Sequence, residues 1–133
     1  MREIKFRAWD GRNNKIVYSG GNIRLSIALD GYIIATQTEM SNPFSLEARD
    51  GKDFIPMQFT GLKDKNGKEI YEGDIVKKTY KAPIHYMETT LGEIIFLNGS
   101  FVVRDKNYHS IMSEWIEVIG NIYENRDLLD DRS

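Results

Sequence analysis

The feature that most constrains this fold is the alternation of short apolar runs with Asn-Gly and Asp-Gly dipeptides. In the C-terminal half, Ile94–Leu97 and Phe101–Val103 flank Asn98-Gly99. Both turn residues tolerate positive φ, which a type I′ hairpin requires. A two-residue turn sets the cross-strand pairs Phe96–Phe101, Ile95–Val102 and Ile94–Val103. Because both faces of this hairpin are apolar, we expect it to be buried on both sides, near the centre of the core.

Strand signals also dominate the N-terminal half. A second hairpin is predicted where Asn22–Leu29 and Tyr32–Thr38 flank Asp30-Gly31. At the start of the chain Ile4, Phe6 and Ala8 alternate with Glu3, Lys5 and Arg7, as in a half-buried strand. The remaining signals are a turn at Asp10–Asn14, a return strand at Lys15–Tyr18 and a last strand at Ile116–Tyr123.

Helical signals are few. Asn42-Pro43 resembles an N-cap followed by proline at the first helical position, so Phe44–Arg49 is expected to form a short helix. A second short helical or irregular piece is expected near Ser110–Trp115. The run Arg126–Asp131 is expected to be a frayed tail, with a docking helix as the alternative.

The 133 residues suffice for one ordinary domain or two very small ones. We expect an N-terminal β unit over residues 1–53, a second β unit over 54–125 and a flexible tail over 126–133, with Ser41–Asp53 as the joint. One compact domain overall is the alternative. Many short strands with regular turns favour a mainly β fold, either a small barrel or a sandwich.

Composition excludes several classes of protein. The chain has no cysteine, which excludes disulfides, thiolate metal sites and a cysteine nucleophile. The start, Met1–Gly11, is neither a signal peptide nor a membrane span, so we expect a cytoplasmic protein with no membrane partner. A net charge of −2 argues against general coating of duplex DNA, although a local basic patch remains open.

No motif for catalysis or for a cofactor is present, and the sequence favours a binding protein over an enzyme. His85 and His109 are the only histidines and lack metal-ligand spacing. Aligning Gly67 with the invariant glycine of a calcium loop puts Leu62 and Gly73 at ligand positions that need a side-chain oxygen, so a polar turn is expected there instead. Asp74 is expected to accept backbone N–H bonds where a loop enters a strand, with a catalytic role as the sharper alternative.

The candidate binding residues are lysines in two nearby segments. Three surround one turn and three follow shortly after, and Tyr71 lies between them with a ring that could stack on bases. The candidates are Lys63, Lys65, Lys68, Lys77, Lys78, Lys81 and Tyr71. Acidic residues are interleaved with them, so a solvated mixed-charge loop is the alternative.

Four segments of the chain resemble the YopX-like family of small phage and prophage proteins: Ile4–Asp10, Gln58–Asp64, Lys68–Val76 and Val118–Asn125. The resemblance implies a small SH3-like barrel beginning near Phe59. It also implies turn or bend positions at Gly61, Gly73, Gly92 and Gly120. The family carries no agreed activity, so it transfers no catalytic residue.

These observations lead to a hypothesis of function. We expect an accessory binding protein of a prophage that recognises a protein or nucleic-acid partner through its loops or an exposed sheet edge. One alternative is self-assembly into a homo-oligomer that covers sheet edges. The other is a metal-dependent hydrolase or nuclease, which would need a cluster of carboxylates with shifted pKa values.

Overall fold

The computed structural model describes residues 3–19, 23–27, 33–37, 44–48, 54–81, 87–105, 109–111 and 116–130. The chain divides into an N-terminal unit, Ile4–Gln58, and a C-terminal unit, Phe59–Ser133 with Met1–Glu3. The division falls inside a strand rather than in a linker. The segment expected to be the joint contains a strand of the N-terminal unit, Phe44–Ala48.

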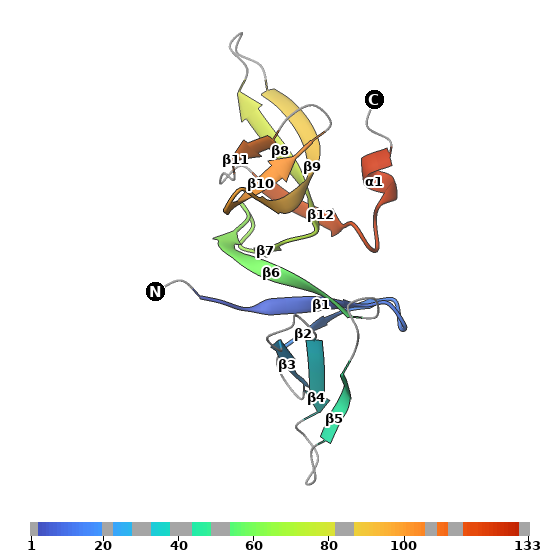
Figure 1. Cartoon of the computed structure of the whole chain (residues 1–133). Coiled ribbons are helices and arrows are strands. Elements are labelled where there is room, and N and C mark those ends of the chain that lie inside the picture. Colours follow the sequence, from blue (N-terminus) through green and yellow to red (C-terminus); the bar gives the residue numbers. More distant parts are fainter. Residues whose placement is uncertain are drawn as a thin grey trace. The chain divides into compact units, whose positions relative to one another are not determined.

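The N-terminal unit consists of β1 (Phe6–Asp10), β2 (Lys15–Tyr18), β3 (Ile23–Ile27), β4 (Ile33–Gln37), β5 (Phe44–Ala48) and the first half of β6 (Phe54–Lys63). β1 pairs antiparallel with β2 on one side and with β6 on the other, while β3, β4 and β5 form a three-stranded sheet (Figure 1). Ala8 and Phe54 are buried together, and the partly buried Leu25 packs against them.

The predicted turn and return strand near the N-terminus are confirmed. Asp10 pairs with Lys15, and its buried carboxylate organises the turn between them. Asp10 Oδ1 accepts the backbone N–H groups of Arg12 at 3.0 Å and Asn13 at 3.3 Å. Asn14 closes the turn with a φ of 52°, in the left-handed region that asparagine tolerates.

The charged side of β1 is less exposed than the alternation suggests. Arg7 is 3% exposed, whereas the apolar Ile4 is 66% exposed. The Arg7 guanidinium donates from Nη1 to Tyr18 Oη at 3.4 Å and from Nη2 to Met57 Sδ at 3.5 Å. A long aliphatic stem allows arginine to pack against apolar neighbours while its charged end keeps polar contacts.

The hairpin of β3 and β4 forms, but its register differs from the simplest expectation. Ile27 pairs with Ile33, whereas a two-residue turn at Asp30-Gly31 would pair Ile27 with Ile34. Asp30 and Gly31 themselves lie outside the described residues.

The helix expected at Phe44–Arg49 is wrong. Phe44–Ala48 is β5, which pairs antiparallel with β4 and places Ala48 opposite Ile34. Phe44, Leu46 and Ala48 alternate with Ser45 and Glu47, and this period of two fits a strand. Pairing with β4 therefore overrides the capping signal of Asn42-Pro43, two residues that lie outside the described part of the chain.

The C-terminal unit consists of the rest of β6, β7 (Glu69–Tyr71), β8 (Asp74–Lys81), β9 (Met87–Leu97), β10 (Ser100–Arg104), β11 (His109–Ile111), β12 (Ile116–Asn121) and α1 (Asp127–Asp130). Five strands form one antiparallel sheet in the order β11-β10-β9-β8-β12, which curls into a half-barrel (Figure 1). The prediction of a mainly β fold with a small barrel in the C-terminal half is confirmed.

The core of this unit is aliphatic. Its buried members are Ile70, Val76, Ile94, Val103, Ile116 and Val118, against which Phe101 packs. The last strand is found where expected, ending at Asn121. The piece expected to be helical begins instead with β11, and Met112–Trp115 lie outside the described residues.

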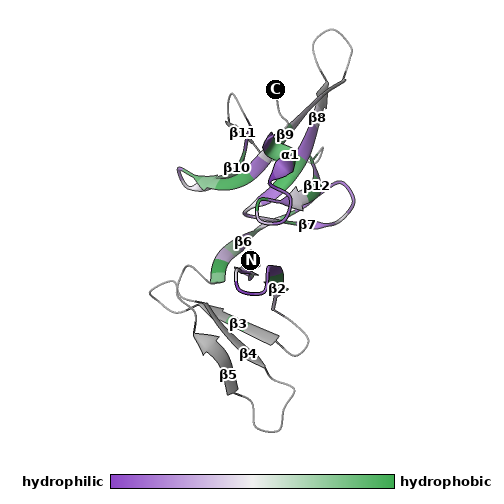
Figure 2. Cartoon of the chain, turned by 90° about the vertical axis from the view of Figure 1, so that its right-hand side faces the viewer, coloured by the Kyte–Doolittle hydropathy of each residue, from purple (hydrophilic) through white to green (hydrophobic). Residues whose placement is uncertain are grey.

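The hairpin of β9 and β10 confirms the predicted register and turn. All three predicted pairs are present, and Asn98 and Gly99 have φ values of 50° and 86°. Burial on both sides is wrong, however. Ile94 is fully buried, but Phe96 is 54% exposed and meets Phe101 edge-on at 5.1 Å. The ribbon of β10 is coloured as largely hydrophobic (Figure 2), although its partner Phe96 is exposed.

Three of the four glycines expected at turns or bends have that role. Gly61 and Gly73 have positive φ values of 89° and 88°. Gly120 follows a shift of register between β12 and β8, beside the side chain of Asn125. Gly92 lies inside β9, where a Cβ atom would stand 2.6 Å from Val103 Cγ1. Close approach of β9 and β10 therefore requires glycine there.

The C-terminal segment is not the frayed tail that was expected. Asp127–Asp130 form one helical turn, α1, and Leu129 is 9% exposed. Burial of the Leu129 side chain offsets the entropy of ordering the segment. No helix in the described part of the chain is long and apolar enough to span a membrane.

Candidate functional site

The turn between β6 and β7 is organised by the carboxylate of Asp64, which is 7% exposed. Oδ1 accepts the backbone N–H groups of Asn66 at 2.8 Å and Lys68 at 2.9 Å. Oδ2 accepts the backbone N–H of Val118 in β12 at 2.9 Å, across 54 residues of sequence. One side chain therefore shapes the turn and fastens it to a distant strand.

The same turn covers part of one edge of the five-stranded sheet. β12 is the last strand in that sheet and pairs with β8 on its other side. Its Ile116 carbonyl accepts the backbone N–H of Lys65 at 3.0 Å, and its Val118 N–H donates to Asp64. Exposed edges allow pairing between chains. The covered positions of β12 therefore do not favour self-assembly through this edge.

Asp64 has a pKa below its ordinary value of 3.8. Burial acts to raise this pKa, but the hydrogen bonds from the backbone of Val118, Lys68 and Asn66 lower it, as does the charge of Lys68. The lowering contributions outweigh burial because each hydrogen bond favours the charged carboxylate. Asp64 is therefore an ionised structural acceptor.

The lowered pKa of Asp64 predicts a loss of stability in acid. A carboxyl with a depressed pKa in the folded state stabilises the protein above its unfolded pKa, and this contribution is lost as the pH falls through the folded value. We expect the stability difference between the wild type and Asp64→Asn to narrow below pH 3.8. Urea unfolding across this range measures it, and a constant difference would contradict the prediction.

The two predicted lysine segments meet at Glu117 on β12. Lys65 Nζ lies 3.6 Å from Glu117 Oε2, with side chains 48% and 31% exposed. Lys77 on β8 stands directly opposite Glu117 in the antiparallel ladder. Glu117 is therefore next to one lysine from each segment, because its carboxylate pairs with Lys65 and its backbone position is opposite Lys77.

The remaining candidate lysines differ in exposure. Lys63 and Lys68 are exposed on the turn, and Lys63 pairs with Glu69 across β6 and β7. Lys78 is half-buried, and burial lowers the pKa of its ammonium group while the charge of Asp105 opposes this effect. The side chain of Lys81 lies outside the described residues. We call the exposed set Lys63, Lys65, Lys68 and Lys77 the lysine face.

Tyr71 does not belong to an accessible surface, and its predicted role in base stacking is wrong. The residue is 4% exposed, and its ring lies 5.5 Å from that of Phe59. Its hydroxyl is 3.3 Å from Glu69 Oε1. Tyr71 is in the interior because it pairs with the buried Phe59 across β6 and β7, and Ile70 beside it is also buried.

The other buried carboxylates of the described residues also serve turns. Asp74 is 1% exposed and its Oδ2 accepts the backbone N–H of Tyr71 at 2.8 Å, which confirms the predicted role. Asp10 has the same function in the N-terminal unit. The described residues contain no group of three potential metal ligands, while His85 and the side chain of His109 lie outside them.

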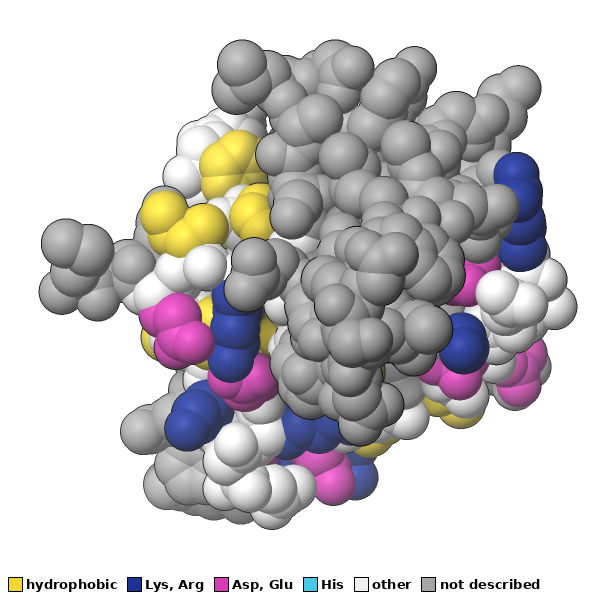
Figure 3. All heavy atoms as spheres, turned by 90° about the horizontal axis from the view of Figure 1, so that it is seen from below, with side chains coloured by type: hydrophobic (Ala, Val, Ile, Leu, Met, Phe, Trp, Pro, Cys, Tyr) yellow, Lys and Arg dark blue, Asp and Glu magenta, His cyan; other side chains and the backbone are white. Residues whose placement is uncertain are grey.

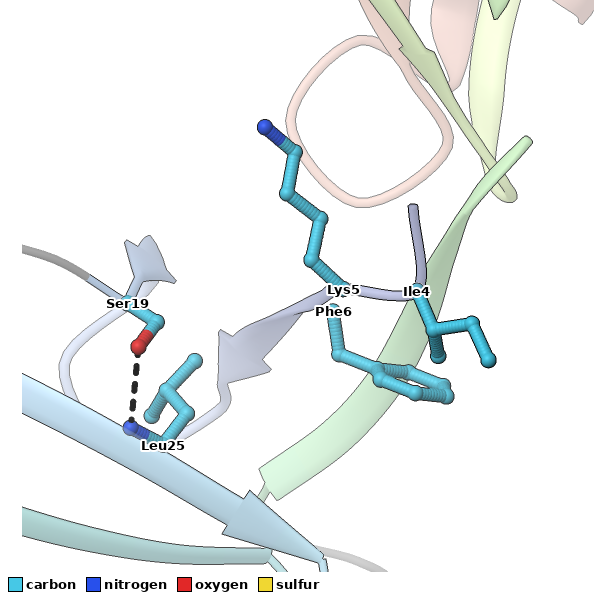
Figure 4. Close-up of a pocket in the computed structure, with 5 residues that line it drawn as sticks. All are labelled: Ile4, Lys5, Phe6, Ser19 and Leu25. Carbon is cyan, nitrogen blue, oxygen red and sulfur yellow. Dashed lines mark hydrogen bonds between the residues drawn. The ribbon is translucent and has the colours of Figure 1, made fainter. Parts of the chain in front are cut away.

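A shallow hollow of about 300 Å³ lies within the N-terminal unit (Figure 4). Its lining is formed by Ile4, Lys5, Phe6, Ser19 and Leu25. Ser19 Oγ accepts the backbone N–H of Leu25 at 3.3 Å, and the side chain of Lys5 points away from those of Ile4 and Phe6. The polar groups of this hollow therefore do not converge on a ligand position.

Sequence reasoning missed Glu117 and the long-range role of Asp64. The run Asp64-Lys65-Asn66-Gly67 is typical of a turn in which the aspartate accepts nearby backbone N–H groups. This signal predicts the hydrogen bonds from Asn66 and Lys68 but not the bond from Val118. Glu117 has no local signal, because its importance arises from the register of β8 and β12.

Two segments that carry the family resemblance, Lys68–Val76 and Val118–Asn125, contact one another in the C-terminal unit. The Gly73 carbonyl accepts the backbone N–H of Ile122 at 2.9 Å, and Asp74 pairs with Asn121. Asn121 Oδ1 in turn accepts the N–H groups of Tyr123 and Glu124, each at 3.0 Å. The motif residues therefore build the frame of the barrel.

Comparison with known proteins agrees with this reading. The chain is similar over its whole length to protein yopX from Bacillus subtilis, with 25% identity, a TM-score of 0.72 and complete coverage of both chains. It is also similar to protein EF1440 from Enterococcus faecalis, with 29% identity and a TM-score of 0.59, covering 97% of this chain and 99% of that one. No curated protein matches the chain.

A family model described as YopX protein matches residues 5–130. This match spans both units and includes every residue of the segments that suggested the resemblance except Ile4. The chain therefore belongs to the YopX protein family.

Proposed function

We propose that this protein is a binding module that recognises a partner bearing acidic groups through the lysine face. The observation that carries the proposal is the meeting of Lys65 and Lys77 at Glu117. The expected setting, as an accessory protein of a prophage in the bacterial cytoplasm, is part of this proposal and follows from the resemblance drawn from the sequence.

Preorganisation of the turn supports a binding role. Asp64 and the Lys65 N–H fasten the turn to β12 at two points, so its backbone is fixed before a partner arrives. Rigid presentation of a surface reduces the entropy lost on binding. The lysine side chains remain exposed, and exposed charges steer and orient a partner.

Asp10, Asp64 and Asp74 are the buried carboxylates of the described residues, and each accepts a backbone N–H in or beside a turn. These contacts explain their burial through stability. The proposal therefore places the function on exposed charges rather than on the buried acids.

Reversal of two charges tests the lysine face. The double variant Lys65→Glu/Lys77→Glu is expected to weaken partner binding about tenfold, because two attractive contacts become repulsive. The partner is first captured from host lysate, with and without nuclease treatment. Its affinity for purified wild type and variant is then measured by calorimetry.

The matched control is Arg12→Glu/Lys15→Glu, which changes the net charge equally on exposed positions of the N-terminal unit. Thermal unfolding verifies that both variants are folded. Equal losses of affinity in the two variants, or no loss in either, would reject the lysine face as the binding surface.

A further inference from the structure

We propose that Glu117 determines the selectivity of the lysine face, directing it to a protein surface with an acidic–basic–acidic row of charges and away from nucleic acid. This inference rests on the proposed function. It begins from the position of Glu117, whose carboxylate is paired with Lys65 of the turn and whose backbone position on β12 is opposite Lys77 of β8.

The three charges form a row of alternating sign. Lys65 reaches Glu117 at 3.6 Å from the turn, and Lys77 faces it across the β8–β12 ladder. The row is basic, acidic and basic. A protein surface with the opposite order can pair with all three groups at once, because its central basic side chain meets Glu117.

The pairing of Lys65 with Glu117 is easily exchanged. Both side chains are substantially exposed, so water screens the interaction and little is lost when a partner replaces it. A carboxylate of the partner can therefore form an ion pair with Lys65 while a basic group of the partner forms one with Glu117.

Nucleic acid fits the same row poorly. Its affinity comes from phosphates neutralised by cations, and a single strand adds stacking on aromatic rings. Phosphates placed on Lys65 and Lys77 would lie beside Glu117, while a second acidic residue, Glu69, stands opposite Lys63. Tyr71 is buried and offers no ring face.

Mixed charge is not confined to this row. Acidic and basic side chains also lie next to one another on the face of the molecule in Figure 3. Elsewhere in the C-terminal unit, Arg104 Nη2 lies 2.8 Å from Glu93 Oε1. What distinguishes Glu117 is its place between two exposed lysines of a fixed turn and strand.

Removal of the Glu117 charge tests the inference with a defined probe. A short fluorescein-labelled oligothymidylate is titrated with the full chain, and anisotropy is recorded from about 50 mM to about 200 mM salt. Glu117→Gln is expected to bind the probe about three- to tenfold more tightly than the wild type at low salt, because phosphates no longer meet a carboxylate. Its salt dependence should also be steeper.

Two further variants show whether a gain in probe binding comes from the Glu117 position rather than from net charge. Asp130→Asn removes one negative charge from an exposed position of α1, outside the lysine face, and should leave probe binding within about twofold of the wild type, since salt screens interactions between separated exposed charges. Lys65→Gln/Glu117→Gln should lose most of the gain, because the freed lysine supplies it.

Tight, strongly salt-dependent binding of the probe by the wild type would overturn the inference and make the lysine face a nucleic-acid site. Equal gains for Glu117→Gln and Asp130→Asn would overturn it as an effect of net charge alone, and no gain would overturn it directly. None of these outcomes decides the proposed function, which is tested separately by the affinity of Lys65→Glu/Lys77→Glu for the captured partner.

Discussion

Replacing Asp64 with alanine is expected to lower the free energy of unfolding by about 2–3 kcal/mol, because three backbone N–H groups lose a charged acceptor and one of them is buried. The Asn66 and Lys68 N–H groups lie in an exposed turn and regain water, so most of the cost arises at Val118. Val118 is 9% exposed in the core, where an N–H without an acceptor is costly. Urea unfolding followed by circular dichroism measures the loss.

Two comparisons separate this cost from other effects of the substitution. Asp64→Asn keeps an oxygen for the turn N–H groups but presents an NH₂ group in place of Oδ2, so it should still lose the bond to Val118. Lys63→Gln changes an exposed side chain of the same turn and should alter stability by less than about 0.5 kcal/mol. If Asp64→Ala were as stable as Lys63→Gln, the carboxylate would not fasten the turn to β12.

The Asp64 bonds also show which parts of the fold could be predicted. The Asn98-Gly99 turn and the register of its hairpin were predictable because two adjacent residues determine both. The contact between Asp64 and Val118 spans 54 residues and depends on how the sheet curls. Local turn chemistry is therefore readable from one sequence, whereas the closure of the barrel is not.

The incorrect predictions have a common physical cause. Phe44–Ala48 carries both a capping signal and a period of two, and pairing with β4 decides between them. Arg7 is charged yet buried, because Tyr18 and Met57 on two neighbouring strands enclose it. In each case the tertiary environment overrides a local preference.

The candidate site was predictable only where it depends on local sequence. The grouping of Lys63, Lys65 and Lys68 around a turn follows from local sequence. Their meeting with Lys77 depends on the pairing of β8 with β12, which also brings in Glu117. Tyr71 was wrongly expected to be exposed, because it lies between the two lysine segments in the sequence. In the structure it is 4% exposed and its ring packs against Phe59.

Gly92→Ala is expected to destabilise the protein by about 3 kcal/mol, the upper end of the usual cost of overpacking. The new Cβ would lie 2.6 Å from Val103 Cγ1 and 2.9 Å from the backbone carbonyl oxygen of Arg104. A side chain can rotate away, but the carbonyl belongs to β10, so relief requires β9 and β10 to separate. On its other side β9 is held by β8, where Val76 lies opposite Gly92. Thermal and urea unfolding measure the loss.

Gly67→Ala is the matched control, since nothing lies within 4 Å of its added Cβ and only its φ of 83° opposes the substitution. That conformational strain costs about 1–2 kcal/mol. A larger loss for Gly92→Ala than for Gly67→Ala would show that close packing of β9 against β10, rather than backbone conformation, requires this glycine. The reverse order would mean that β9 can move away from β10 at little cost, and the half-barrel would then be less tightly packed than its buried aliphatic core implies.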